Sequence, residues 1–137
     1  MELKIWQETT VMLFGGAAYV AIELLWRGRS HITMFVLGGV CFWLIGRLNC
    51  RGTLPLAVQI CLAVCMVTAL ELITGLIVNK MLELHVWDYS VLPMNFMGQI
   101  CLYYCLLWIP LSVAAIFLED GLRKLLFGVP LPKYRVF

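Results

Sequence analysis

The stretch from Trp87 to Cys101 reads WDYSVLPMNFMGQIC and separates two long apolar runs of the chain. It presents an indole, a carboxylate, a phenol, a hydroxyl and two carboxamides in close succession. Its flanks are too hydrophobic for a loop around a soluble active site. The stretch therefore predicts a polar site at the rim of a bundle of membrane helices.

The rest of the composition is that of an integral membrane protein. Of the 137 residues, 63% are apolar and 13% are charged, whereas soluble domains are about half apolar and a quarter charged. A helix that crosses the hydrocarbon core needs about 20 apolar residues, so there is room for about four such helices. We expect one all-α transmembrane domain over residues 1–137. The net charge of +2 is spread over the helix ends, so nucleic acid is not an expected partner.

The apolar runs place four helices at about residues 9–25, 32–48, 54–79 and 95–118. The second helix is short, so it either spans the membrane or forms a re-entrant segment. Residues 80–92 combine apolar and charged side chains, which predicts an amphipathic segment at the membrane interface before the fourth helix. The tail, residues 119–137, carries basic residues around an apolar cluster. It predicts a second amphipathic segment, lying on an anionic leaflet.

Two acidic residues interrupt the predicted spans, and ionisable groups there are costly and usually functional. Glu71, deep in the third helix, must be protonated, paired or facing a hydrated cavity. A neutral Glu71 could also simply donate a hydrogen bond to a neighbouring carbonyl. Glu23 lies four residues after Tyr19 and therefore on the same face of the first helix. Near the end of that helix, Glu23 could instead be solvated or paired with Arg27 or Arg29.

The distribution of basic residues predicts the orientation. With four crossings, one side of the membrane holds both termini and seven basic residues: Lys4, Arg47, Arg51, Arg123, Lys124, Lys133 and Arg135. The other side holds three: Arg27, Arg29 and Lys80. The positive-inside rule therefore predicts that both termini are cytoplasmic and that residues 87–95 face outward.

In this topology, polar residues from separate stretches reach the same depth in the outer half of the bundle. We expect them to form an acidic pocket for a cation or a small polar solute, with aromatic faces available for cation–π contact. The expected binding residues are Tyr19, Glu23, Glu71, Trp87, Asp88, Tyr89, Asn95 and Gln99. Taken alone, Trp87 and Tyr89 are also typical of the aromatic belt at a membrane interface.

The cysteines offer a competing hypothesis of metal binding. Cys61 and Cys65, like Cys101 and Cys105, place two sulfurs on one helix face. If the two faces met, they would offer four ligands to a soft metal. Apolar surroundings disfavour thiolates, so we expect core packing and no metal site. No nucleophile–base pair or cofactor motif stands out, so we expect no catalytic residues and no cofactor.

Two blocks of sequence carry a resemblance to a known family. The first reads TALELITG at residues 68–75, and the second is the WDYS…P.N..GQICL pattern of residues 87–102. Tyr19, Glu23 and the Arg27–Gly28 pair match further positions. Over most of residues 14–118 the chain resembles a bacterial family of small membrane proteins described as putative ABC-transporter type IV, or CmpB-like permeases. It departs from the pattern at residues 35–39, where FVLGG replaces a Gly- and Pro-rich segment.

The resemblance implies a multi-pass protein of the bacterial plasma (inner) membrane with a role in transport. The chain has no G-x-x-x-x-G-K-[ST] motif, so an ATPase would be a separate polypeptide. We therefore expect a permease or substrate-binding subunit. Its expected partners are membrane lipids, further copies of the chain in a homo-oligomer, and a separate ATPase or other membrane subunit.

Two alternatives of a different class stay open. The first is an intramembrane enzyme acting on a lipid or prenyl substrate, with Asp88 and Glu71 as acid and base. The second is an accessory subunit of a larger membrane complex, whose polar pocket holds a partner helix.

Overall fold

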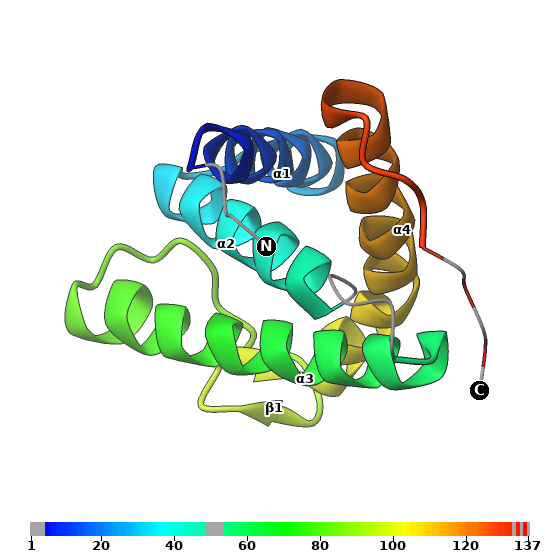
Figure 1. The fold of residues 1–137 in the computed structure, drawn as a ribbon. Coiled ribbons are helices and arrows are strands. Elements are labelled where there is room, and N and C mark those ends of the chain that lie inside the picture. Colours follow the sequence, from blue (N-terminus) through cyan, green and yellow to red (C-terminus); the bar gives the residue numbers. More distant parts are fainter. Residues whose placement is uncertain (1–4, 49–53, 133, 135, 137) are drawn as a thin grey trace.

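The computed structural model describes residues 5–48, 54–132, 134 and 136, and these form a small helical bundle. The elements are the helices α1 (Ile5–Arg27), α2 (Ile32–Leu48) and α3 (Leu56–Gly75), the π-helical turn η1 (Leu76–Met81), the two-residue strands β1 (Asn95–Phe96) and β2 (Ile100–Cys101), and helix α4 (Leu102–Phe127). Figure 1 shows α1 and α2 side by side above α3, with β1 beneath α3 and with α4 steeply inclined to α3.

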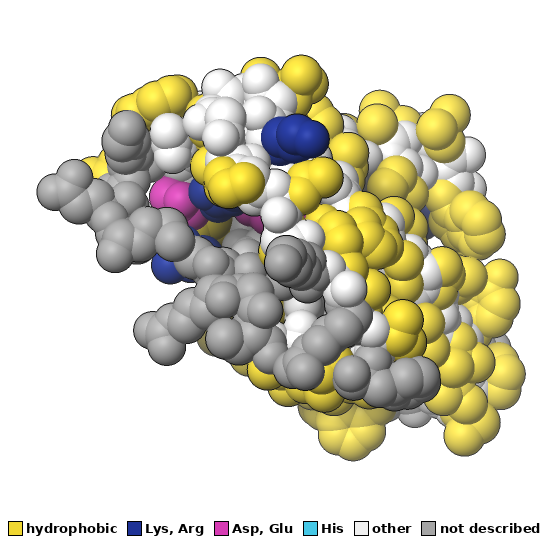
Figure 2. All heavy atoms as spheres, turned by 45° about the vertical axis from the view of Figure 1, so that its right-hand side comes forward, with side chains coloured by type: hydrophobic (Ala, Val, Ile, Leu, Met, Phe, Trp, Pro, Cys, Tyr) yellow, Lys and Arg dark blue, Asp and Glu magenta, His cyan; other side chains and the backbone are white. Residues whose placement is uncertain are grey.

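The predicted all-α membrane architecture is confirmed. Within the described residues, three helical segments are long and apolar enough to cross a membrane: Ile5–Arg27, Leu56–Met81 and Leu102–Phe127. Helix α2 is equally apolar but shorter, with 17 residues. Large hydrophobic side chains are exposed along all three long segments, and they also cover most of the described surface on the face in Figure 2. Such a surface suits a lipid environment, so the chain is an integral membrane protein.

Glycines allow α1 and α2 to approach each other closely. A Cβ atom on Gly39 would lie 2.5 Å from the carbonyl oxygen of Met12, and one on Gly16 would lie 2.6 Å from the carbonyl oxygen of Phe35. Each helix therefore presents backbone to the other, which is a common way of packing membrane helices.

Gly39→Ala is expected to lower the free energy of unfolding by about 1–3 kcal/mol, because its Cβ would meet rigid backbone instead of a movable side chain. The matched control is Gly121→Ala, because a Cβ at Gly121 would meet no other described atom within 4 Å apart from its chain neighbours and the backbone of its own helix. That control should be neutral or stabilising by up to about 1 kcal/mol. Unfolding curves in mild detergent measure both effects. Equal stabilities for the two variants would contradict this account of the α1–α2 contact.

The predicted start of the fourth helix at residue 95 is wrong. Residues 95–101 form an antiparallel hairpin in which Asn95 pairs with Cys101, and α4 begins only at Leu102. The hairpin turns through left-handed backbone at Met97 (φ 55°) and Gly98 (φ 72°), a conformation that a right-handed helix cannot contain. The preceding connection, residues 82–94, is irregular, with left-handed backbone at Glu83 and His85.

The predicted end of the fourth helix at residue 118 is also wrong, because α4 continues to Phe127. It ends at Gly128, whose φ is 69°. The amides of Gly128 and Val129 donate to the carbonyls of Lys124 and Arg123 at 3.1 and 3.3 Å, a glycine-based helix end. Beyond it, Tyr134 donates a 2.8 Å hydrogen bond to Asp120.

Candidate functional site

Asn79 fastens the polar connection between α3 and α4 to the end of the third span. Its Oδ1 accepts hydrogen bonds from the amides of Val86 and Trp87 at 2.8 and 3.4 Å, and its Nδ2 donates to Gln99 Oε1 at 2.8 Å. The Trp87 indole donates to the Gln99 carbonyl oxygen at 3.0 Å. All three side chains are buried. Trp87 and Gln99 therefore hold the connection in place.

The π-helical turn η1 sets the direction of Asn79. Within this turn and just after it, amides bond to carbonyls five residues back, as the Leu82 amide does to Ile77 at 2.9 Å. The wider turn changes which side chains face inward compared with a continued α-helix. Val78 and Asn79 are the two buried residues of η1.

Glu71 joins the connection to α4. Its Oε1 accepts a 3.0 Å hydrogen bond from the Tyr89 hydroxyl, and its Oε2 accepts a 2.9 Å hydrogen bond from the Trp108 indole. The residue is only 3% exposed. A buried carboxyl group with both oxygens hydrogen-bonded is stable in its position, and it fixes the two aromatic rings that bond to it. Burial raises the pKa of Tyr89 above its usual range, so this phenol remains a hydrogen-bond donor.

Further aromatic rings complete the cluster around Glu71. The Tyr89 ring stacks on Tyr104, with centroids 4.6 Å apart and an interplanar angle of 17°, and the Trp108 ring contacts Tyr19 at 5.8 Å. Tyr104 and Trp108 were not predicted from the sequence as residues of this cluster. They are four residues apart on one face of α4, and a buried indole needs an acceptor, so their spacing was a usable signal.

A cavity of about 370 Å³ lies between α1, α2 and α4. Most of its lining is apolar, with Phe42 and Ile45 of α2 on one side. Three of the predicted binding residues, Tyr19, Glu23 and Tyr89, line it. Glu71 is not among the lining residues. Tyr89 and Trp108 do line the cavity, and their side chains donate hydrogen bonds to Glu71. Glu71 therefore shapes the wall instead of lining it.

Glu23 and Arg27 form an ion pair at one end of this cavity. Arg27 Nε donates to Glu23 Oε2 at 2.6 Å, and Arg27 Nη1 donates to the carbonyl oxygen of Val86 at 3.1 Å. Of the alternatives for Glu23, the structure contains the pairing with Arg27. The pair also ties the end of α1 to the connection that Asn79 fastens.

Ser112 of α4 also lines the cavity. It is 1% exposed, and its Oγ has no hydrogen-bond partner among the described residues. A buried hydroxyl without a partner costs free energy unless something else completes its hydrogen bond.

Asp88 and Asn95 shape the connection locally. Asp88 Oδ1 accepts a 2.9 Å hydrogen bond from the Ser90 amide, and the side chain is exposed. Asn95 Oδ1 accepts from the Gly98 amide at 3.0 Å, and Asn95 Nδ2 donates to the Leu92 carbonyl at 2.8 Å. Neither residue lines the cavity. The structure therefore does not bring the Asp88 carboxylate to Glu71.

Asp88→Asn is expected to lower the melting temperature at pH 7 only slightly, because Asn loses the charge but retains the acceptor for the Ser90 amide. That hydrogen bond lowers the pKa of Asp88, so the anionic form stabilises the wild type above its unfolded-state pKa of about 4. This contribution is lost as the pH falls through the lowered pKa, and the variant should lack that part of the acid sensitivity. Melting curves between pH 7 and about pH 3 measure both effects. A clear loss of stability at pH 7 would contradict a purely local role.

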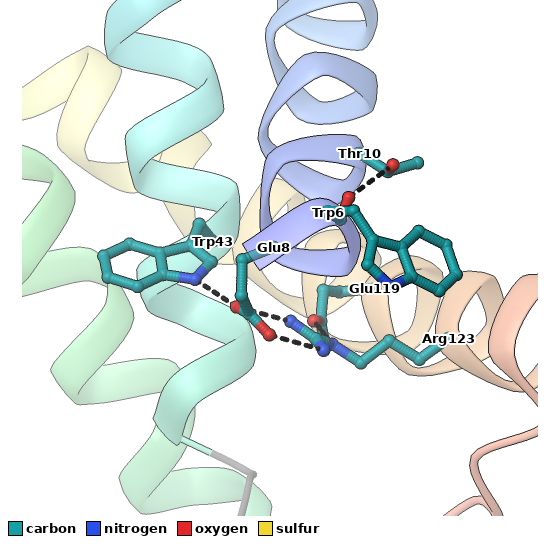
Figure 3. Close-up of polar contacts among 6 residues, drawn as sticks. All are labelled: Trp6, Glu8, Thr10, Trp43, Glu119 and Arg123. Carbon is teal, nitrogen blue, oxygen red and sulfur yellow. Dashed lines mark hydrogen bonds and ion pairs between the residues drawn. The ribbon is translucent and has the colours of Figure 1, made fainter. Parts of the chain in front are cut away.

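A second polar cluster lies at the other end of α1, where sequence analysis predicted no site (Figure 3). Arg123 donates to both carboxylate oxygens of Glu8 at 3.0 and 3.1 Å and also bonds to Glu119. The Trp43 indole donates to Glu8. A Cβ on Gly46 would collide with the carboxyl group of Glu119. Glycine at that position therefore leaves the space for a buried acid, and the cluster joins α1, α2 and α4.

The cysteine hypothesis finds no support in the described part of the chain. Cys61 and Cys65 are exposed, so the core packing expected for these two is wrong, whereas Cys101 is buried; these, with Cys41 and Cys105, are free thiols. Over residues 5–48, 54–132, 134 and 136, no group of three or more His, Cys, Asp or Glu side chains is placed to hold a metal ion.

Comparison with known proteins gives one family. The family described as putative ABC-transporter type IV matches residues 6–130. No curated protein and no solved structure matches the chain. The family match spans all four helices and both polar clusters.

Proposed function

Because the chain belongs to the putative ABC-transporter type IV family, we propose that it is a membrane-embedded permease or substrate-binding subunit of a transport system. Its solute binds in the cavity between α1, α2 and α4. The family name supports the general role of a transporter component. The cavity itself is the observation that supports a solute site.

The size and lining of the cavity favour ligand binding. Its volume of about 370 Å³ falls in the range of roughly 300–1,000 Å³ that is typical of small-molecule sites. Such sites combine mainly apolar walls with a few polar groups that orient the ligand. Here the polar groups are the Glu23–Arg27 pair, the hydroxyl groups of Tyr19 and Tyr104, and Ser112.

The transport system needs further components in this proposal. The chain carries no phosphate-binding G-x-x-x-x-G-K-[ST] motif, so a separate ATPase or other membrane subunit supplies the energy. We also propose a bacterial plasma-membrane location with both termini cytoplasmic, on the balance of basic residues, and assembly as a homo-oligomer.

The alternative of a lipid-modifying enzyme fits the geometry less well. It needs Asp88 and Glu71 to act on one substrate as acid and base. Asp88 is exposed and bonded to the Ser90 amide, whereas Glu71 is buried beneath Tyr89 and Trp108. The two carboxyl groups therefore share no substrate-sized space, and a binding role is preferred.

Native mass spectrometry after gentle purification tests the proposal, because it reports subunit stoichiometry and retained small molecules together. We expect a retained solute that is lost in Ala114→Trp, where the indole fills the cavity from an exposed lining position. The control is Ala17→Trp, at an exposed alanine of α1 outside the cavity. Reconstitution with an ATP-hydrolysing partner should then give ATP-dependent movement of that solute into liposomes.

Three results would contradict the proposal. Chemical turnover of a lipid by the pure protein would favour the enzyme. A partner helix retained in place of a solute would favour an accessory subunit. A solute retained equally by the two tryptophan variants would place binding outside this cavity.

A further inference from the structure

We infer that the cavity takes an amphipathic molecule with a zwitterionic head group and a single apolar chain, which enters sideways from the bilayer. This inference rests on the proposed function and names the class of its ligand. Three features of the cavity carry it: the paired charges at one end, the apolar wall with one unpartnered hydroxyl, and the apolar mouth.

The charged end offers one acceptor and one donor to a ligand. Glu23 uses Oε2 for Arg27, and Arg27 uses Nε for Glu23 and Nη1 for the Val86 carbonyl. Within the described residues, Glu23 Oε1 and Arg27 Nη2 have no partner. A free carboxylate oxygen suits an ammonium group, and a free guanidinium nitrogen suits a phosphate or carboxylate. The two charges together complement a head group that carries both signs.

Aromatic side chains at the same end favour an ammonium group that is substituted and weakly hydrated. Trp26 donates a 3.5 Å hydrogen bond to the Tyr104 hydroxyl, and both residues line the cavity with Tyr19. The faces of such rings attract alkylated ammonium groups through cation–π interaction. A single inorganic cation would leave most of the apolar wall without a partner.

The rest of the wall suits an apolar chain that carries one polar group. Ser112 lies eight residues after Tyr104 on α4, about 12 Å further along the helix axis. Its buried hydroxyl has no partner among the described residues. An ester or hydroxyl group on the ligand chain would complete that hydrogen bond. The surrounding lining is apolar, so the remainder of the chain gains free energy by leaving water.

The exposed residues among those that line the cavity mark its mouth, and all of them are apolar. Ile22 of α1 and Leu118 of α4 both line the cavity, and they are 47% and 46% exposed. Exposed apolar residues on two membrane helices face acyl chains. A ligand already dissolved in the bilayer can therefore enter between α1 and α4 without its apolar chain crossing water.

Binding of three amphiphiles with saturated fourteen-carbon chains tests the ligand class. The probes are myristoyl lysophosphatidylcholine, myristyl trimethylammonium and myristyl phosphate, titrated against the full-length protein in non-ionic detergent by native mass spectrometry. We expect the zwitterionic probe to bind at least tenfold more tightly than either singly charged probe. Ala114→Trp should weaken its binding at least tenfold, and the control Ala17→Trp should not.

Three further variants separate the contacts. Glu23→Gln should remove most of the preference for the lysolipid over the phosphate probe. Arg27→Gln should remove most of the preference for the lysolipid over the trimethylammonium probe. Ser112→Ala should weaken the lysolipid by about two- to tenfold, the worth of one hydrogen bond. Because the two charge variants change selectivity in opposite directions, a general loss of folding cannot imitate the pattern.

The outcomes distinguish this inference from the proposed function. If Ala114→Trp abolishes binding but a singly charged probe binds as tightly as the lysolipid, the ligand class is overturned and the cavity remains the site. If none of the amphiphiles binds and a water-soluble solute is retained instead, the class is likewise overturned. If Ala114→Trp leaves lysolipid binding unchanged, the lysolipid binds outside the cavity and this inference fails, and the proposed function fails with it only if the retained solute is also unaffected by Ala114→Trp.

Discussion

Arg123→Met is expected to lower the free energy of unfolding by up to about 3–5 kcal/mol, the cost of removing one partner from a fully buried ion pair, because Glu119 is buried whereas Arg123 and Glu8 are partly exposed. Arg123 is the counter-ion of two carboxyl groups, Glu8 and Glu119. Glu119 is 1% exposed. Without the guanidinium these acids would lie together in a largely apolar environment, so they would have to take up protons or separate the helices.

The measurement is the midpoint of thermal or denaturant unfolding in mild detergent, with Lys124→Met as the matched control. Lys124 is the exposed neighbour of Arg123 on α4, so its replacement should change the midpoint little. Adding Glu119→Gln to Arg123→Met should recover part of the loss, since it removes one uncompensated carboxyl group. A single Arg123→Met variant as stable as the Lys124→Met control would show that the cluster in Figure 3 contributes no net stability.

Glu71→Leu is expected to cost about 2–5 kcal/mol and to abolish ligand binding in the cavity. Leucine removes the acceptor of both the Tyr89 hydroxyl and the Trp108 indole. Each buried donor left without a partner costs about 1–3 kcal/mol. Both rings line the cavity, so the wall should rearrange even though position 71 does not touch the ligand.

Glu71→Gln is the matched control for this effect. Glutamine has nearly the same shape and keeps one oxygen acceptor, so it should retain one of the two hydrogen bonds and part of the binding. Unfolding midpoints and lysolipid titrations on the two variants measure stability and binding separately. Equal binding by Glu71→Leu and the wild type would contradict a positioning role for Glu71.

The membrane spans were predictable because a spanning helix is recognised by its length and its apolar residues, and both can be read from the sequence. Boundaries were harder where apolar residues continue through a turn. Phe96 and Ile100 extend the apolar run of the fourth helix, which hid the hairpin, although Pro93 and Gly98 are typical turn residues. At the C-terminal end of the fourth helix, the acidic Glu119 directly follows the predicted last residue of the helix. Its contact with Arg123, one turn later, shows why the helix continues.

The candidate site was predictable in part. Burial and hydrogen bonding of Glu71 follow from a carboxyl group inside a span, but its partner Trp108 depends on how α3 and α4 are rotated against each other. A single sequence gives no such angle. Asp88 was grouped with the other acids by position alone, whereas the Asp-x-Ser pattern favours the local turn that it forms. The binding role of the eight predicted residues remains a prediction.

The π-helical turn at residues 76–81 has a consequence for how this protein tolerates sequence change. A π-helical turn takes up one residue more than an α-helical turn for about the same rotation, so removing one residue there would restore ordinary helical winding and leave the chain after the turn facing nearly the same way relative to α3. A deletion within α3 itself would instead rotate everything after it by about 100°. We therefore expect a scan of single-residue deletions to retain more folded protein between Leu76 and Met81 than within α3, except at Asn79, whose side chain binds the amides of Val86 and Trp87.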